Sequence, residues 1–255
     1  MISVKVIGQG QPLVLLHGWG MHGGLMSGLA DNLARDHEVY LVDLPGHGRS
    51  SPLNGGSFQV NDVLDSLAAC LPSSAHWVGW SLGGLVSLSM ALRAPERVRS
   101  LVLLATSPRF LEAEGWPGVQ SGLLDQMGRD FVGDYQVTLN RFVGLQTFGQ
   151  EGGRQLAKLI LERLSEAPRP DEESLLASLD FLKHTDLRGN LSELIGPVAI
   201  ILGDRDRLVP VAQASALRQL LPVADVRVIE GAAHLPFMTH EADVSLIIRE
   251  FLGRH

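Results

Sequence analysis

The chain has 255 residues, of which 45% are hydrophobic, and its formal net charge is −7 at pH 7. This length and apolar content suffice for one large core, or for one core with a small appendage. The negative charge disfavours nucleic acid as a partner. No stretch approaches the roughly 20 apolar residues of a membrane span, and the single cysteine, Cys70, excludes an intrachain disulfide.

The N-terminus enters a strand-like run without the charged leader and apolar segment of a signal peptide, so we expect a cytoplasmic protein. A cysteine-based zinc site is disfavoured because there is no second cysteine. We expect Cys70 to pack within a helix. Nothing in the sequence indicates a metal or a cofactor, and we expect a monomer that binds neither nucleic acid nor membrane.

Short apolar runs alternate with helical periodicity through the first hundred residues. The runs typical of buried strands are 12–16, 38–43, 76–78 and 98–105, and the helical segments between them are about 25–35, 61–71 and 85–92. Buried strands that alternate with helices predict a parallel α/β sheet covered by helices on both faces.

The pattern changes between residues 107 and 190, where it is helical and contains no strand of the earlier kind. Strands and helices then resume at 197–203, 211–220, 225–230 and 242–252. We therefore predict an α/β core formed by residues 1–106 and 191–255, with residues 107–190 inserted between two strands as a helical lid.

Residues 78–84, Val-Gly-Trp-Ser-Leu-Gly-Gly, place Ser81 in a G-x-S-x-G pattern between a strand and a helix. In so tight a turn, a Cβ atom at Gly79 or Gly83 would collide with neighbouring backbone. The turn leaves the serine side chain at the carboxyl end of the strand, above a helix N-terminus whose free N–H groups favour an anion. Ser81 is therefore the candidate nucleophile.

A serine hydroxyl at pH 7 needs an adjacent base, normally a histidine that a carboxylate orients. Catalytic groups of an open parallel sheet lie just beyond the carboxyl ends of its strands. The loop after residue 230 supplies His234 as the candidate base, and His240, which opens the last helix, is the alternative.

Two aspartates compete for the carboxylate role in the loop that follows the strand at 197–203. Asp204 comes directly after the strand, where we expect it to anchor the turn. Asp206 lies deeper in the loop, before an apolar run, and is the one we favour.

Two backbone N–H groups are needed to stabilise a tetrahedral oxyanion. One is expected from Leu82, the residue after the nucleophile, and the other from Trp19, in the Gly-rich loop after the first apolar strand. The side chains of Trp19 and Trp80 either form walls of an acyl pocket or pack in the core.

Most of the other histidines have ordinary interpretations. His17 and His47 precede or follow glycines and are expected to brace their loops, and His184 lies in the predicted lid. Four more are expected at or near the surface: His22, His37, His76 and His255.

The chain order of Ser81, Asp206 and His234 resembles that of the α/β-hydrolase superfamily, and the resemblance covers nearly the whole chain. It is carried by Leu-Leu-His-Gly-Trp-Gly at 15–20, by Asp-Leu-Pro-Gly-His-Gly-Arg-Ser at 43–50, by the serine turn and by the two loops just described. The resemblance implies the α/β-hydrolase fold, with a mostly parallel central sheet and a helical lid. It does not distinguish esterases, C–C hydrolases, lactonases or perhydrolases.

Three segments are similar to a narrower family, the biotin-pathway carboxylesterases: Gly-Trp-Ser-Leu-Gly-Gly at 79–84, Trp-Pro-Gly at 116–118 and Arg-Phe-Val-Gly-Leu-Gln-Thr at 141–147. This resemblance implies a serine esterase that hydrolyses the methyl ester of pimeloyl-[acyl-carrier protein], and short-chain esters as well. It also implies a substrate pocket lined by Trp19, Ser81, Leu82, Phe142, Val143, Gly144, Leu145, Gln146 and His234.

An acidic carrier protein would be steered by a basic patch near the pocket mouth. The candidates are Arg141, Arg154 and Lys158, of which the last two are one helical turn apart. Residues 107–190 hold nine Lys and Arg against thirteen Asp and Glu, so any such patch is local.

Two other functions fit the same scaffold. One is a serine hydrolase that cleaves a C–C bond in dienoic ring-cleavage products, and activity on simple esters without activity on vinylogous keto acids would exclude it. The other is a non-catalytic ligand-binding protein, which would be expected to lack a member of the catalytic triad.

Overall fold

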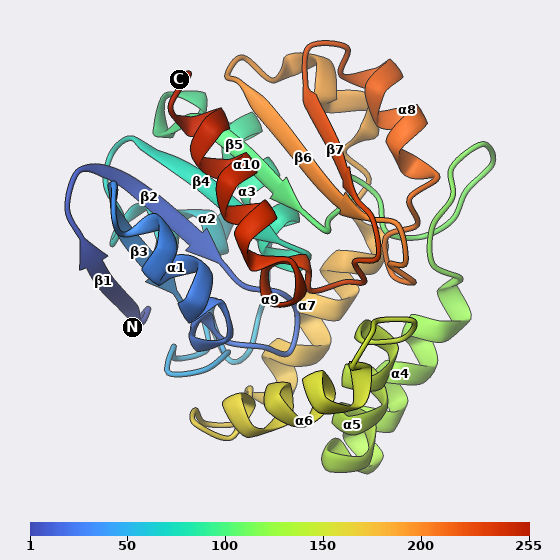
Figure 1. Cartoon of the computed structure of the whole chain (residues 1–255). Coiled ribbons are helices and arrows are strands. Elements are labelled where there is room, and N and C mark those ends of the chain that lie inside the picture. The colour runs from blue at the N-terminus through green and yellow to red at the C-terminus, as the bar shows by residue number, and fades with distance from the viewer.

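A computed structural model describes all 255 residues and contains one seven-stranded sheet, in the order β1-β3-β2-β4-β5-β6-β7 (Figure 1). All neighbouring strands are parallel except β1 and β3. The strands are β1 (Val4–Gly8), β2 (Gln11–Leu16), β3 (His37–Val42), β4 (Ala75–Trp80), β5 (Val98–Leu104), β6 (Val198–Gly203) and β7 (Asp225–Ile229). The predicted mostly parallel sheet is confirmed.

Helices cover both faces of this sheet. Helices α1 and α10 pack against each other on the face nearer the viewer in Figure 1, and α2 packs against α3 on the other face. The helices of this part are α1 (Ser27–Leu33), α2 (Val60–Ala68), α3 (Leu82–Arg93), α8 (Gln213–Leu220), α9 (Pro236–Thr239) and α10 (Glu241–Leu252), with short 3₁₀ helices η1 (Gly23–Met26), η2 (Pro95–Arg97) and η3 (Arg188–Glu193). Sixty-nine buried apolar residues join into one core cluster.

Three expectations about single residues are wrong. Helix α2 ends at Ala68, so Cys70 lies beyond it and is exposed. His22 and His76 are buried rather than near the surface. Each finds partners for both ring nitrogens, His22 at Arg163 O and Gly24 N, and His76 at Ser100 Oγ and Gln11 Oε1. A buried polar ring is tolerated when both nitrogens are hydrogen-bonded in this way.

Four helices lie between β5 and β6: α4 (Ser121–Gly133), α5 (Tyr135–Gln146), α6 (Gly153–Leu164) and α7 (Glu172–His184). They form a layer beyond the carboxyl ends of the parallel strands (Figure 1). Two begin with an aspartate N-cap: Asp134 accepts a hydrogen bond from Val137 N and Asp171 accepts one from Ser174 N. No helix in the protein has both the length and the apolar content needed to cross a membrane.

Candidate active site

Ser81 occupies the turn between β4 and α3 with φ 53° and ψ −117°, a conformation that non-glycine residues rarely adopt. Close packing of the turn enforces it, because a Cβ built on Gly79 would lie 2.3 Å from Gly83 O. Both backbone polar groups of Ser81 are held by β5 and the residues just after it: its N–H donates to Leu104 O at 3.0 Å and its carbonyl accepts from Thr106 Oγ1 at 2.6 Å. Strain stored in this way is characteristic of functional sites.

The structure brings Ser81, His234 and Asp206 into one chain of hydrogen bonds. His234 Nε2 lies 3.0 Å from Ser81 Oγ, and His234 Nδ1 lies 2.7 Å from Asp206 Oδ2. An ionised carboxylate only accepts hydrogen bonds, so Nδ1 carries the proton and Nε2 is left as the acceptor for the serine hydroxyl. This is the arrangement that activates a serine as a nucleophile.

The carboxylate of Asp206 is fixed by its own loop. Its Oδ1 accepts from Leu208 N at 2.8 Å and from Val209 N at 3.0 Å, which leaves Oδ2 free for the imidazole. All three side chains are sheltered from solvent, since Ser81, Asp206 and His234 are only 6%, 5% and 2% exposed. A low local dielectric strengthens the attraction between such groups.

The two alternative residues take no part in this hydrogen-bond chain. Asp204 accepts from Gly231 N at 2.8 Å and so ties together the two loops that follow β6 and β7, which is the anchoring role expected for it. His240 precedes α10 and contacts Thr239 Oγ1 at 2.9 Å. The geometry therefore selects Asp206 and His234.

The loop that carries Trp19 lies directly against the serine, because a Cβ on Gly18 would be 3.2 Å from Ser81 Cβ. The Trp19 backbone N–H donates to no acceptor in the protein. Leu82 is the first residue of α3, where a backbone N–H has no acceptor within its own helix. Both N–H groups expected to form an oxyanion hole are thus available to an incoming ligand.

His17 holds the Trp19 loop in place, as expected. Its Nδ1 donates to Gly18 O at 2.8 Å, and its Nε2 accepts from Leu44 N at 2.9 Å. Burial, with the added effect of His47 nearby, lowers the pKa of His17 to about 3. The ring is therefore neutral at ordinary pH, as its role as both donor and acceptor requires. His47 braces the next loop by donating from Nδ1 to Pro45 O.

The two tryptophans near the serine have different surroundings. The Trp19 ring packs edge-on against Phe131 and Phe142, each at a centroid distance of 5.1 Å, so it lies between the serine and the α4–α5 pair. Trp80 packs against Phe237 and donates from Nε1 to His234 O at 2.8 Å. Trp80 therefore supports the histidine loop from within the core.

Residues 142–146 of α5 do not all face the serine. Phe142 contacts Trp19, and Gln146 is buried, with its carbonyl accepting from His234 N at 3.3 Å. Val143 is fully buried and Leu145 is half-buried. Gly144 is exposed, and a Cβ on it would meet nothing within 4 Å, so it points away from the site. The helical repeat places Phe142 and Gln146 together on one face.

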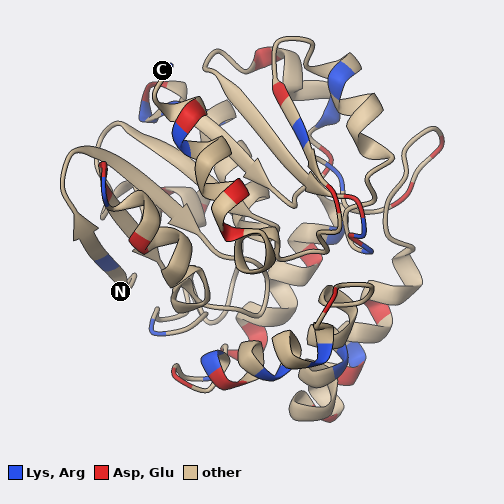
Figure 2. Ribbon diagram, in the orientation of Figure 1, with Lys and Arg blue, Asp and Glu red and all other residues tan.

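The three basic residues expected to meet a carrier protein lie on α5 and α6, where blue and red residues alternate in Figure 2. Arg141 is 3.6 Å from Asp130 and Lys158 is 3.7 Å from Glu162, whereas Arg154 has no ion pair. Arg141, Lys158 and Glu162 are exposed and Asp130 is half-buried, and ion pairs at the surface contribute little stability.

Sequence reasoning missed two residues that position the site. Thr106, just beyond β5, holds the Ser81 carbonyl, and the Gln150 side chain accepts from Ala233 N at 3.1 Å beside His234. The location of Thr106 at the carboxyl end of the neighbouring strand was a usable signal. Gln150 carried none. No group of three or more His, Cys, Asp or Glu side chains is close enough to hold a metal ion.

A family model described as the alpha/beta hydrolase fold matches residues 11–241, and the chain belongs to this family. Within it, the chain is 42% identical over 252 residues to the pimeloyl-[acyl-carrier protein] methyl ester esterase of Methylococcus capsulatus, covering 99% of this chain and 98% of that one. It is 38% identical over 252 residues to the enzyme of the same name from Aeromonas salmonicida, covering 99% of each. These two relatives are carboxylic ester hydrolases by name.

Solved structures show the same fold. An esterase from Exiguobacterium antarcticum aligns with a TM-score of 0.88 at 22% identity, covering 99% of this chain and 95% of that one. The enol-lactonase of Burkholderia xenovorans aligns with a TM-score of 0.84 at 20% identity, covering 99% and 96%. Likeness at this identity establishes the architecture and leaves the substrate to the site.

Proposed function

We propose that this protein is a serine carboxylesterase that hydrolyses the methyl ester of pimeloyl-[acyl-carrier protein] to the free pimeloyl carboxylate and methanol, in biotin synthesis. The observation that carries the chemistry is the hydrogen-bond chain from Ser81 through His234 to Asp206. The full-length relatives at about 40% identity support the substrate. Short-chain carboxylic esters are expected to react as well.

In this mechanism Ser81 Oγ attacks the ester carbonyl while His234 Nε2 takes the hydroxyl proton, and Asp206 holds the imidazole and stabilises its charged form. The backbone N–H groups of Trp19 and Leu82 stabilise the oxyanion. Methanol leaves with the proton from His234. A water molecule that His234 deprotonates then hydrolyses the acyl-serine, and the enzyme is regenerated.

In the proposal, residues 1–106 and 191–255 are the catalytic core and residues 107–190 are a lid that forms the acyl pocket. Trp19 and Phe142 supply apolar surface for the seven-carbon chain, and apolar contact stabilises it by roughly 25 cal/mol per Å² buried. Ser81 is only 6% exposed, and we expect the lid to shift when the ester enters. Arg141, Arg154 and Lys158 are proposed to meet the acidic carrier protein.

The test is hydrolysis of pimeloyl-[acyl-carrier protein] methyl ester, and of p-nitrophenyl esters of rising chain length, by wild type and Ser81→Ala. We expect a much higher kcat/KM for the carrier substrate, and loss of both activities in the variant. If only short simple esters reacted, the biotin-pathway substrate would be rejected, and the assignment of Ser81, Asp206 and His234 as the catalytic triad would stand. Activity that survives in Ser81→Ala would exclude Ser81 as nucleophile.

A dienoic keto acid added to the same assays tests the C–C hydrolase. Its cleavage in preference to esters would replace the proposal. The absence of any turnover, together with ligand binding, would favour a non-catalytic protein. The intact hydrogen-bond chain argues against that outcome, because a binding protein does not need a serine aligned with a histidine and a carboxylate.

A further inference from the structure

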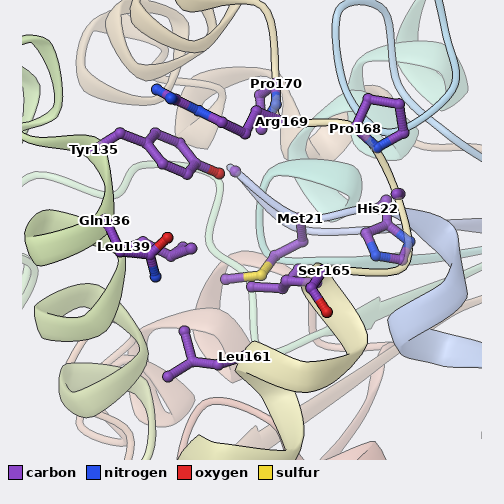
Figure 3. A pocket seen from close by; sticks show the side chains of 13 residues that line it. Met21, His22, Tyr135, Gln136, Leu139, Leu161, Ser165, Pro168, Arg169 and Pro170 are labelled. Atoms are coloured by element: carbon purple, nitrogen blue, oxygen red, sulfur yellow. The ribbon is translucent and has the colours of Figure 1, made fainter.

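Two hollows lie side by side next to the Trp19 loop. The first has a volume of about 270 Å³ and is lined by Gly20, Met21, α5 and the end of α6 (Figure 3). The second, of about 480 Å³, is lined by residues 22–24, by β1 and by Arg163 and Glu166. His22 borders both hollows. The consecutive residues 19–24 thus pass from the serine to the first hollow and then to the second.

One face of α5 connects the first hollow with the serine. Gln146 accepts from the backbone of His234, Phe142 packs on Trp19, and Leu139 and Tyr135 line the hollow. These residues recur at helical spacing, so they share one face. The interval from Tyr135 to Gln146 corresponds to about 16 Å of helix. The same face of α5 therefore lines the first hollow at its start and reaches the histidine loop beside Ser81 at its end, with the buried Phe142 between them.

The first hollow has mixed walls that suit a chain with both methylenes and amides. Leu139 and Leu161 are apolar, and Gln136 and Ser165 offer hydrogen-bonding groups. Arg169 lies 4.0 Å above the Tyr135 ring and forms no ion pair, so its guanidinium donors are available (Figure 3).

The second hollow is polar and basic in a protein whose net charge is −7. Lys5, Arg49 and Arg163 border it, and none has a carboxylate partner within ion-pair distance. Arg49 Nη2 donates to the carbonyl of Glu166, and Arg163 Nη1 donates to Ser27 Oγ. Both guanidinium groups keep further N–H donors, which suit phosphate oxygens.

Two acidic residues also border the second hollow, and they oppose an anion to different degrees. Asp43 has both oxygens occupied, because Oδ1 accepts from Gly23 N at 2.7 Å and Oδ2 accepts from Arg49 N at 2.9 Å. Glu166 is exposed. Three cationic side chains against these two carboxylates leave the hollow with a net positive charge.

We propose that the two hollows form one groove for the arm that carries the acyl chain, with its amide-containing stem in the first hollow and its phosphate group in the second. This inference rests on the proposed function, because an acyl-carrier protein presents its acyl group on a flexible thioester-linked arm that ends in a phosphodiester. Lys5, Arg49 and Arg163 bind the phosphate, and Arg169 and Gln136 contact the stem.

Binding to Ser81→Ala tests the groove without requiring turnover. The probes are the methyl pimeloyl thioesters of pantetheine and of 4′-phosphopantetheine, which differ only in the phosphate, and inorganic phosphate alone. By calorimetry at low salt, we expect the phosphate to tighten thioester binding about tenfold or more, and added salt to reduce this ratio. Equal affinities of the two thioesters would reject the proposal that the groove binds the phosphate group of the arm.

Variants assign the effect to the second hollow. In Arg163→Gln or Lys5→Gln, each added to Ser81→Ala, we expect the affinity ratio of the two thioesters to fall toward one. Lys5 lies exposed on the edge strand β1, so its replacement tests the charge even if Arg163→Gln disturbs packing. The matched control is Arg129→Gln, because Arg129 is an exposed arginine on α4 that hydrogen-bonds to Gln126 and lines neither hollow.

Two further outcomes separate the sources of the phosphate and the two proposals. If inorganic phosphate bound as tightly as the phosphorylated thioester, free phosphate would be the ligand, and the proposal that the groove binds the acyl-carrying arm would be rejected. A phosphate-dependent affinity with no hydrolysis by the wild-type protein would support the groove and would reject the proposed function. If the affinity ratio of the two thioesters stayed the same in both Lys5→Gln and Arg163→Gln, the phosphate would bind elsewhere, and the second hollow would be rejected as its site.

Discussion

The indole N–H of Trp19 donates to the carbonyl oxygen of Leu175 at 2.8 Å, and this bond joins the loop beside Ser81 to helix α7. The carbonyl belongs to the first turns of α7, whose N-cap Asp171 also donates its backbone N–H to Gly46 O at 2.8 Å. The insertion between β5 and β6 is therefore fastened to two loops at the carboxyl edge of the sheet. One of these loops carries an N–H assigned to the oxyanion hole.

We expect Trp19→Phe to reduce kcat/KM about fivefold, because it retains an aromatic ring and loses one hydrogen bond worth about 1 kcal/mol. Steady-state hydrolysis of a short p-nitrophenyl ester measures the effect. The matched control is Trp77→Phe, which removes a similar bond, from Trp77 Nε1 to Arg97 O, in a residue buried within β4. Equal losses in both variants would show that the Leu175 bond has no particular role in the site.

Asp206→Asn is expected to lower kcat about 10³- to 10⁴-fold, because an amide in this position favours the wrong imidazole tautomer. The Asn oxygen can still accept from Leu208 N and Val209 N, so we expect the loop to keep its conformation. Asp204→Asn is the matched control two residues away, and its activity should stay within a few-fold of wild type. If the control lost more activity than Asp206→Asn, the choice between the two aspartates would be reversed.

Gly79→Ala is expected to prevent folding or to reduce the free energy of unfolding severely, because its Cβ would lie 2.3 Å from Gly83 O.

Gly144→Ala should instead stabilise the protein by about 0.5–1 kcal/mol. Its Cβ would meet no atom within 4 Å, and alanine has a higher helix propensity than glycine at this position of α5. Urea denaturation measures both. Kinetics of Gly144→Ala also test the expected pocket, because a raised KM would show that Gly144 contacts substrate after all.

The free energy of unfolding should decrease as the pH falls from about 6.5 toward 4. Burial, together with nearby His37, Arg99 and His255, lowers the pKa of His76 from its ordinary 6.5 to about 4. A protonated His76 is thus favoured in the unfolded chain, so stability is complete above the unfolded pKa and is lost as the pH falls toward the folded one. The buried His17, with a pKa of about 3, acts in the same direction.

Urea titrations at pH values from 8 to 4 measure this dependence. His76→Gln is expected to be less stable than wild type at pH 8, because the bonds to Ser100 and Gln11 are disturbed, and to lose less stability on acidification. A decline as steep in the variant as in wild type would assign the acid sensitivity to other groups.

The sequence by itself determined the parallel strands, the nucleophile Ser81 and the two loops that supply its partners. Apolar runs bounded by Gly and Pro marked the central parallel strands, because a strand that is buried on both faces carries apolar side chains on both. The glycines around Ser81 marked the turn, since only glycine fits at Gly79. Strand ends then restricted the partners of Ser81 to two loops, because chain order and sheet topology fix which loops meet at one edge.

Only the tertiary structure decided between Asp204 and Asp206, because both stand in one loop and differ only in which way the loop turns them. It also decided which residues of α5 face the serine and placed Gly144 outside. The burial of His22 and His76 was likewise hidden, because their partners Arg163 and Ser100 are 141 and 24 residues away. The groove beside Trp19 joins residues from β1, α5 and α6, and such convergence exists only after the chain has packed.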